Sequence, residues 1–121
     1  MSHLKDQISF GKKTRLLARL KIGGSVYDLI MCSALHLGVT SCSGVCDTGQ
    51  KVIYIDAEAE DYTETLIHEM CHALFFEFCI SRHSSWCEAF EEVICEAVGR
   101  AIGQNFQLAP KPGLRRQARH R

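Results

Sequence analysis

Five consecutive residues, His68-Glu69-Met70-Cys71-His72, combine side chains that bind a metal ion with one that can move a proton. On an α-helix, residues four apart lie on one face, about 6 Å apart along the axis. That spacing lets two imidazoles converge on one zinc ion. Glu69 would then lie beside the open position of the metal, where a carboxylate can accept a proton from water. The pattern predicts a zinc site with His68 and His72 as ligands and Glu69 as general base and acid.

A catalytic zinc site needs a third protein ligand. A second apolar segment offers four glutamates: Glu88, Glu91, Glu92 and Glu96. Glu91 lies nearer the broad apolar stripe of this segment. Glu92 shares a face with Cys95 and Gly99, where small residues would let two helices approach closely. The periodicity leaves Glu91 and Glu92 as the two alternatives for the third ligand.

Two helices must position these residues. Apolar spacing predicts one over residues 62–80, with Asp61 or Thr63 as its N-cap, buried on several sides. It predicts a second over residues 86–106. The expected core stripe of the second helix is Phe90, Val93, Ile94, Ala97, Val98, Ala101 and Ile102.

Strands are expected before the helices. Two alternating runs flank Gly23 and Gly24, which is typical of a β-hairpin, although a helix over residues 14–20 is the competing prediction. Residues 51–56 are β-branched or aromatic and form the clearest strand. The order of elements predicts an α+β domain, in which a small N-terminal sheet packs on two helices.

Composition predicts one domain over residues 1–107. The chain has 121 residues, is 46% hydrophobic and carries a net charge of zero. Residues 108–121 contain both prolines and a cluster of arginines, so we expect a flexible basic tail. A solvated terminus is the simpler interpretation of this tail. Its alternative is a weak contact with nucleic acid or an acidic partner.

The N-terminal residues contain no uninterrupted apolar region, and no later segment is long enough to span a bilayer. We therefore expect a cytoplasmic protein without a membrane partner. Seven cysteines suit this location as reduced thiols. We expect four of them to be buried apolar groups of the helices: Cys71, Cys79, Cys87 and Cys95. We expect Cys42 and Cys46 to be thiols of a loop or strand.

Three segments together resemble a known group: residues 53–56, residues 65–74 and residues 91–98. They look like the small phage-type zinc metallopeptidases, minimal zincins similar to the SprT-like and ImmA/IrrE-like groups. The resemblance implies a zincin-like fold, zinc as cofactor, His68 and His72 as ligands, Glu92 as third ligand and Glu69 as the catalytic residue. The chain departs from metzincins, because Phe75 and Phe78 replace their glycine and third histidine. It also lacks the cysteine-rich ribbon frequent in SprT-like proteases.

The expected activity is hydrolysis of peptide bonds in a peptide or protein substrate, by zinc-activated water with Glu69 as base and acid. Candidate oxyanion donors are Tyr54, Tyr62 and His83. An extended substrate could pair with a strand edge formed by residues 45–47 or 51–55. The alternative function is a zinc-stabilised binding or regulatory module without turnover.

Overall fold

The computed structural model describes residues 4–106 and 113–114, and the predicted tail over residues 108–121 lies almost wholly outside them. The chain is a small α+β domain, as predicted. Its helices are α1 (Leu4–Gln7), α2 (Tyr62–Glu77) and α3 (Glu88–Asn105), with a 3₁₀ turn η1 (Ile80–Arg82). Its strands are β1 (Ile8–Ser9), β2 (Thr14–Ile22), β3 (Ser25–Cys32), β4 (His36–Leu37), β5 (Thr40–Ser41), β6 (Gly44–Asp47) and β7 (Val52–Asp56). None of the helices in the described ranges is long and apolar enough to cross a membrane.

A four-stranded sheet in the order β2-β3-β7-β6 forms the base of the domain. The predicted hairpin is confirmed: β2 and β3 are antiparallel and joined at Gly23 and Gly24, and Gly23 has a φ of 62° that favours glycine. β7 is parallel to β3 and antiparallel to β6. β6 is therefore an edge strand, whereas β7 lies between two partners.

A second, three-stranded sheet in the order β1-β4-β5 was not predicted. Its strands have only two residues each, too short for a hydrophobic period to reveal them. Cys32, Leu35, Val45 and Tyr54 form a small apolar cluster of buried residues between this sheet and the larger one.

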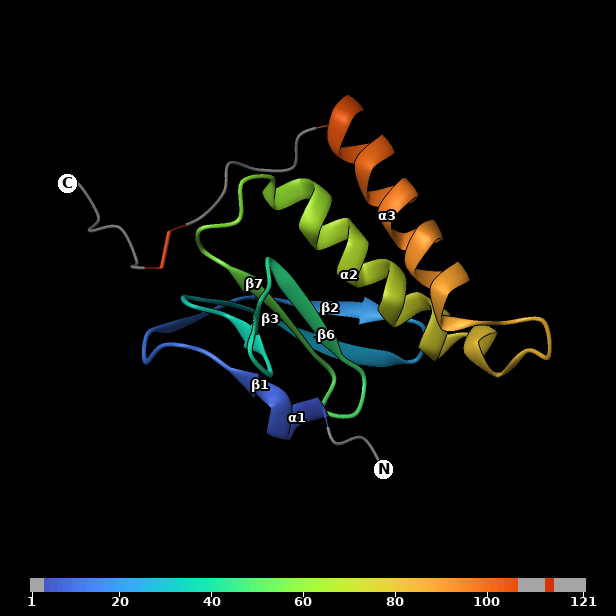
Figure 1. Ribbon diagram of the computed structural model, residues 1–121, viewed down its shortest axis with the longest axis horizontal. Helices are drawn as coiled ribbons and strands as arrows, with labels where there is room; N and C mark the ends of the chain where they lie inside the picture. Colours follow the sequence, from blue (N-terminus) through green and yellow to red (C-terminus); the bar gives the residue numbers. More distant parts are fainter. Residues whose placement is uncertain (1–3, 107–112, 115–121) are drawn as a thin grey trace.

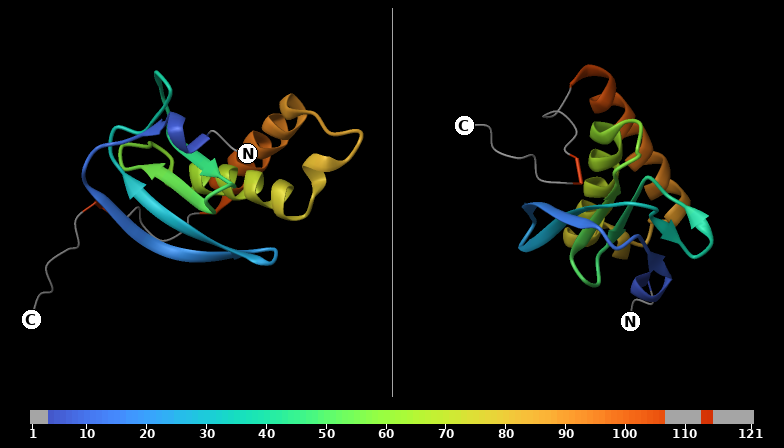
Figure 2. Two further views of the ribbon diagram at one scale, coloured as in Figure 1. Left: turned by 90° about the horizontal axis from the view of Figure 1, so that it is seen from below. Right: turned by 90° about the vertical axis from the view of Figure 1, so that its left-hand side faces the viewer.

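α2 lies between the four-stranded sheet and α3 (Figures 1 and 2). Asp61 caps its N-terminus by accepting a hydrogen bond from the backbone N–H of Glu64 at 2.9 Å. Of the two predicted N-caps, Asp61 is therefore confirmed and Thr63 is wrong. Leu66 and Ala73 face the sheet core, while Cys71 and Phe75 pack toward α3. The prediction that this helix is buried on several sides is confirmed, although it ends at Glu77 and a 3₁₀ turn follows.

α3 packs on α2 through small residues. A Cβ atom on Gly99 would lie 2.8 Å from the carbonyl oxygen of Glu64 and 3.2 Å from the backbone nitrogen of His68. A Cβ atom on Gly103 would lie 3.1 Å from Cβ of Glu64. Cys95 is fully buried in the same contact. The two helix backbones therefore approach as closely as glycine permits.

The predicted core stripe of α3 is wrong for most of its length. Phe90, Val93 and Val98 are 56%, 64% and 37% exposed, and Ala97 and Ala101 are exposed too. Only Ile94 and Ile102 of the stripe are partly buried. Periodicity identifies the apolar face of a helix, but here the neighbouring helix covers the small-residue face instead.

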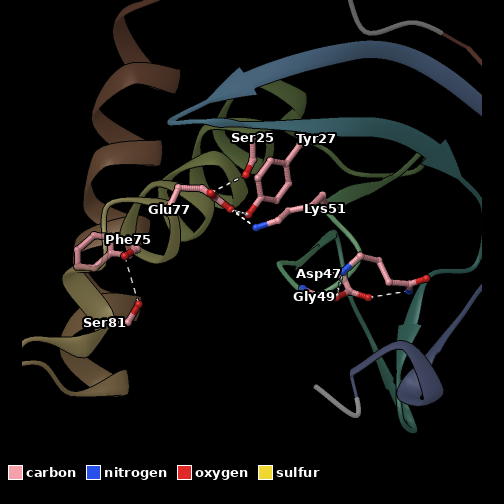
Figure 3. Close-up of polar contacts among 9 residues, drawn as sticks. Ser25, Tyr27, Asp47, Gly49, Lys51, Phe75, Glu77 and Ser81 are labelled. Carbon is pink, nitrogen blue, oxygen red and sulfur yellow. Dashed lines mark hydrogen bonds and ion pairs between the residues drawn. The ribbon is translucent and has the colours of Figure 1, made fainter. Parts of the chain in front are cut away.

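A polar cluster joins the C-terminal end of α2 to the sheet (Figure 3). The hydroxyls of Ser25 and Tyr27 each donate to the Glu77 carboxylate at 2.7 Å, and Lys51 forms an ion pair with it. These contacts lower the pKa of Glu77 to about 2, through Lys51 first and then Ser25 and Tyr27. They offset the unfavourable placement of a carboxylate at a helix C-terminus.

Asp47 closes the turn between β6 and β7 (Figure 3). Its carboxylate accepts from the backbone N–H groups of Gly49 and Gln50 at 3.0 and 3.1 Å. The side-chain amide of Gln50 also donates to it at 2.8 Å. Asp47 is almost fully buried, and these hydrogen bonds compensate the cost of burying its charge.

All seven cysteines are free thiols, as predicted. Cys71 and Cys95 are buried between α2 and α3, and Cys46 lies in β6. Cys79 and Cys87 are exposed, so the expectation that they are buried is wrong. Cys87 instead caps α3, since its sulfur accepts from the backbone N–H of Phe90.

Gly99→Ala should destabilise the fold by about 1–3 kcal/mol, because the new methyl group would collide with the backbone of α2. On an exposed helix the same change stabilises by up to about 1 kcal/mol. Urea unfolding would measure the difference. Gly24→Ala is the matched control, since nothing lies within 4 Å of its Cβ position. Equal stability of the two variants would contradict the close helix contact.

Glu77→Gln should lower the free energy of unfolding at pH 7 by about 1–3 kcal/mol, because it weakens hydrogen bonds to a charged group. The folded pKa of about 2 lies below the ordinary 4.5, so the carboxylate stabilises the fold above pH 4.5. That contribution is lost as the pH falls toward 2. Urea unfolding across this range should show the variant and wild type converging at low pH.

The control for this series is Asp28→Asn, whose ion pair with Arg19 at 3.4 Å is largely exposed. It should change stability by less than about 1 kcal/mol. A gap between Glu77→Gln and wild type that stays constant from pH 7 to pH 2 would contradict the role of the carboxylate.

Candidate metal centre

α2 brings His68 and His72 together, because the two residues are one turn apart on the face that borders α3. Their ring centroids lie 5.0 Å apart, and their Nε2 atoms lie 3.2 Å apart. Both side chains are about four-fifths buried, with 19% and 21% exposed. The four-residue spacing on a helix therefore brings the two imidazoles together, as predicted.

Glu92 of α3 completes this group. One carboxylate oxygen lies 2.9 Å from Nε2 of His68, and the other lies 2.9 Å from Nε2 of His72. The carboxylate can reach both rings because Gly99 and Gly103 let α3 approach α2 so closely. The three predicted ligand residues thus lie side by side.

The donor atoms suit a zinc ion. Bonds of about 2.1 Å in tetrahedral geometry separate neighbouring ligand atoms by about 3.4 Å. The distance of 3.2 Å between the two Nε2 atoms is close to that value, and each Nε2 atom lies 2.9 Å from a different carboxylate oxygen of Glu92. Two imidazole nitrogens and one carboxylate also form a donor set that zinc accepts well. The Glu92 side chain is 53% exposed, so the group opens toward solvent.

Glu91 contacts the same histidine from its other side. Its carboxylate lies 2.6 Å from Nδ1 of His72, and the indole N–H of Trp86 donates to it at 2.8 Å. A carboxylate only accepts hydrogen bonds, so this contact favours a proton on Nδ1 of His72, and Nε2 of the neutral ring would then carry the lone pair that binds metal. Of the two alternatives, Glu92 lies at the Nε2 atoms, and Glu91 is placed to orient His72.

Charges near His72 raise its pKa. Burial lowers the pKa of this imidazole, but the hydrogen bond to Glu91 and the charges of Glu69 and Glu92 outweigh burial.

Sequence reasoning missed Trp86 as a member of the hydrogen-bond network of Glu91 and His72. Its position five residues before Glu91, at the start of a helix, was the only available signal.

A second group of potential ligands lies behind the first. Among the described residues, His72, Glu91 and Cys95 also have ligand atoms within 4.8 Å of one another. Cys95 is fully buried, and burial raises the pKa of its thiol, which disfavours the thiolate that binds metal. The group of His68, His72 and Glu92 is the better metal site, because it is open and its ligands need no such ionisation.

The side chain of Glu69 lies between α2 and β6 and lines the same cleft as His68 and Glu92. It is only 8% exposed, and burial raises its pKa to about 7. His72 and a hydrogen bond from the backbone of Cys46 oppose this rise, while Glu92 adds to it. A Cβ atom on Gly44 would lie 3.0 Å from Cγ of Glu69, so this glycine leaves room for the carboxylate.

A cleft runs across the site in two lobes, of about 720 and 490 Å³. The residues that both lobes share are Cys42, Gly44, His68, Glu69 and Glu92. β6 forms one wall, so the predicted strand edge at residues 45–47 lies in the right place. The alternative edge at residues 51–55 is wrong, because β7 is paired on both sides.

The predicted oxyanion donors do not reach the site. Tyr54, Tyr62 and His83 line neither lobe of the cleft. Tyr54 packs against Phe10, with ring centroids 5.1 Å apart, and Tyr62 packs against the sheet core. His83 lies exposed in the segment between α2 and α3.

Searches of protein-family models, curated proteins and solved structures found no match to this chain. The functional argument therefore depends on the arrangement of the side chains.

If these three side chains are zinc ligands, alanine at His68, His72 or Glu92 should abolish tight zinc binding, because each change removes a ligand atom. Glu91→Ala should weaken binding by about 10- to 100-fold, the usual effect of losing a residue that orients a ligand. Competition with a chromophoric chelator would measure the affinities, with circular dichroism to check folding. Exposed Glu88→Ala is the control. Loss of zinc from Glu91→Ala with retention by Glu92→Ala would reverse the two assignments.

Proposed function

We propose that this protein is a zinc-dependent metallopeptidase with His68, His72 and Glu92 as ligands. The observation that carries the proposal is the convergence of these three side chains within 3.2 Å of one another, in a cleft that the buried Glu69 also lines. The α+β arrangement, with α2 and α3 following a sheet, supports the minimal zincin-like fold that the motif predicts.

Zinc bound by these residues would supply a Lewis acid that polarises a carbonyl and makes water more acidic. Glu69 accepts the proton of the attacking water and delivers it to the leaving amine. Its pKa of about 7 places both protonation states within reach near neutral pH. The positive charge of a bound cation favours the carboxylate, the form that accepts the proton.

The ligand set favours catalysis over a purely structural role. Structural zinc sites are usually closed by four protein ligands, whereas catalytic sites keep one position for water or substrate. Here the better group has three protein ligands and opens into a cleft. Burying a carboxylate beside the ligands costs free energy, and titratable groups whose pKa is shifted by burial are frequent at functional sites.

β6 suits a polypeptide substrate. It is the edge strand of the four-stranded sheet, and it lines the cleft beside His68 and Glu69. An extended chain can add to such an edge through backbone hydrogen bonds, which do not depend on sequence. The scissile bond would then lie over the metal centre.

Glu69→Gln should reduce peptide hydrolysis by about 10²- to 10⁴-fold, because the amide cannot accept the proton. Zinc affinity should persist, since Glu69 is not a ligand. In the wild type, kcat/KM should fall as the pH drops through the pKa of Glu69, because protonation removes the base. Fluorogenic peptide turnover and metal content would be measured together, with Asp28→Asn as a control far from the cleft.

Unchanged turnover by Glu69→Gln would remove this residue from the mechanism. Tight zinc binding by a wild-type protein that hydrolyses no peptide would instead support the alternative, a zinc-stabilised module without turnover.

A further inference from the structure

The two lobes of the cleft differ in chemistry. They meet at the metal centre, so a polypeptide bound across it would place the residues on either side of the scissile bond in different surroundings. One lobe is lined largely by carboxylates, and we call it the acidic lobe. Glu88 and Glu91 also border the other lobe, but its lining adds large aliphatic and aromatic side chains that the acidic lobe lacks, and we call it the apolar lobe.

The acidic lobe has a net negative wall. Its outer carboxylates come from the segment before α2 and from both long helices: Glu58, Glu60, Asp61, Glu64 and Glu96. Arg100 forms ion pairs with Glu64 and Glu96 at 3.6 and 2.7 Å, which offsets part of this charge. No lysine or arginine of the described chain lines the lobe itself.

The lobe is more than a group of surface acids. Its lining includes His68 and Glu92, so a polypeptide bound across the metal centre would extend between its walls on one side. Glu58, Glu60 and Glu96 are exposed, and all three line this lobe. A basic side chain on the bound polypeptide would meet opposite charge there.

The apolar lobe offers a different surface. Its lining includes Leu37, Val45, Phe76 and Trp86. Phe76 is 41% exposed, and the indole of Trp86 is held by its hydrogen bond to Glu91. A bulky apolar side chain would lose water-exposed surface on entering this lobe, which favours binding.

The direction of β6 orders the two lobes along a substrate. Residues 41–43, before β6, line the acidic lobe, whereas Val45, Cys46 and Thr48 line the apolar lobe. Antiparallel pairing is slightly more stable per residue than parallel pairing. A substrate strand antiparallel to β6 therefore runs from the apolar lobe to the acidic lobe.

We propose that the substrates are polypeptides with a bulky apolar residue on the amino side of the scissile bond and lysine or arginine on its carboxyl side. This substrate class rests on the proposed peptidase function, and it follows from the chemistry of the two lobes and the direction of β6.

The test uses the zinc-loaded full chain and quenched fluorogenic peptides of equal length. One peptide carries Phe followed by two Arg at the centre, the second replaces Arg with Glu, and the third reverses the order of Phe and Arg. The first should show a kcat/KM at least about tenfold above the others, and salt should reduce its advantage over the Glu peptide. Mass spectrometry would confirm the bond cleaved.

Charge-matched variants test the acidic lobe. The double variant Glu58→Gln/Glu60→Gln should lower kcat/KM for the Phe-Arg peptide by about 3- to 10-fold, mainly through KM, because exposed ion pairs are individually weak. Asp6→Asn/Asp28→Asn removes the same charge from residues that line neither lobe, and it should have no effect. Phe76→Ala should reduce the preference for Phe over Ala in the apolar lobe.

Peptide binding by the zinc-loaded Glu69→Gln variant, measured by fluorescence anisotropy, separates the two proposals. Turnover of all three peptides at equal rates would overturn the substrate class and leave the peptidase intact. Turnover of the reversed peptide alone would overturn the proposed direction. Selective binding of the Phe-Arg peptide without turnover by wild type would support the two-lobe recognition and overturn the peptidase.

Discussion

The separation of α2 and α3 depends on two positions of α3 that carry no side chain. Gly99 and Gly103 face the backbone and Cβ atoms of α2 at distances that a methyl group would not tolerate. At this separation the short side chain of Glu92 reaches the Nε2 atoms of both histidines. A wider spacing would leave two imidazoles on one helix and a carboxylate on another, with no common centre. The chemistry of the site thus follows from close packing.

Position and burial give three neighbouring carboxylates different roles in the proposed site. Glu92 is half exposed and faces both Nε2 atoms. Glu91, one residue earlier, is rotated by about 100° around the helix and contacts the opposite side of His72. Glu69 is enclosed between α2 and β6, where burial raises its pKa toward neutrality. One residue type therefore serves as ligand, orienting group and proton acceptor, according to its surroundings.

Local geometry was predictable from the sequence, and long-range pairing was not. The four-residue spacing of His68 and His72 determines their proximity as soon as the segment is helical. Likewise, Gly23 and Gly24 indicate a hairpin because the turn and its flanking runs are adjacent in the chain. The preference for Glu92 over Glu91 could be anticipated only from the small residues that share its face.

The failures have a physical cause as well. The parallel pairing of β3 with β7 joins strands separated by most of the smaller sheet, and no local pattern encodes it. The apolar stripe of α3 was expected in the core, yet it faces solvent. Hydrophobic spacing reports how a helix is divided into faces, whereas glycine and cysteine determine which face another helix can approach. The prediction of the oxyanion donors was wrong for a similar reason, since residue type alone does not determine where a side chain lies in the fold.

The glycine-lined contact also means that α3 docks on α2 mainly through small residues. Few bulky side chains hold it to α2, because Phe90, Val93 and Val98 point away. A cation shared by ligands on both helices would add its binding free energy to that contact, about 4 kcal/mol when the free ion exceeds Kd a thousandfold. Metal occupancy and helix docking are then one linked equilibrium. Because the group opens into the cleft, an ion can enter or leave without separation of the helices, and metal availability would then set the local stability of a single helix.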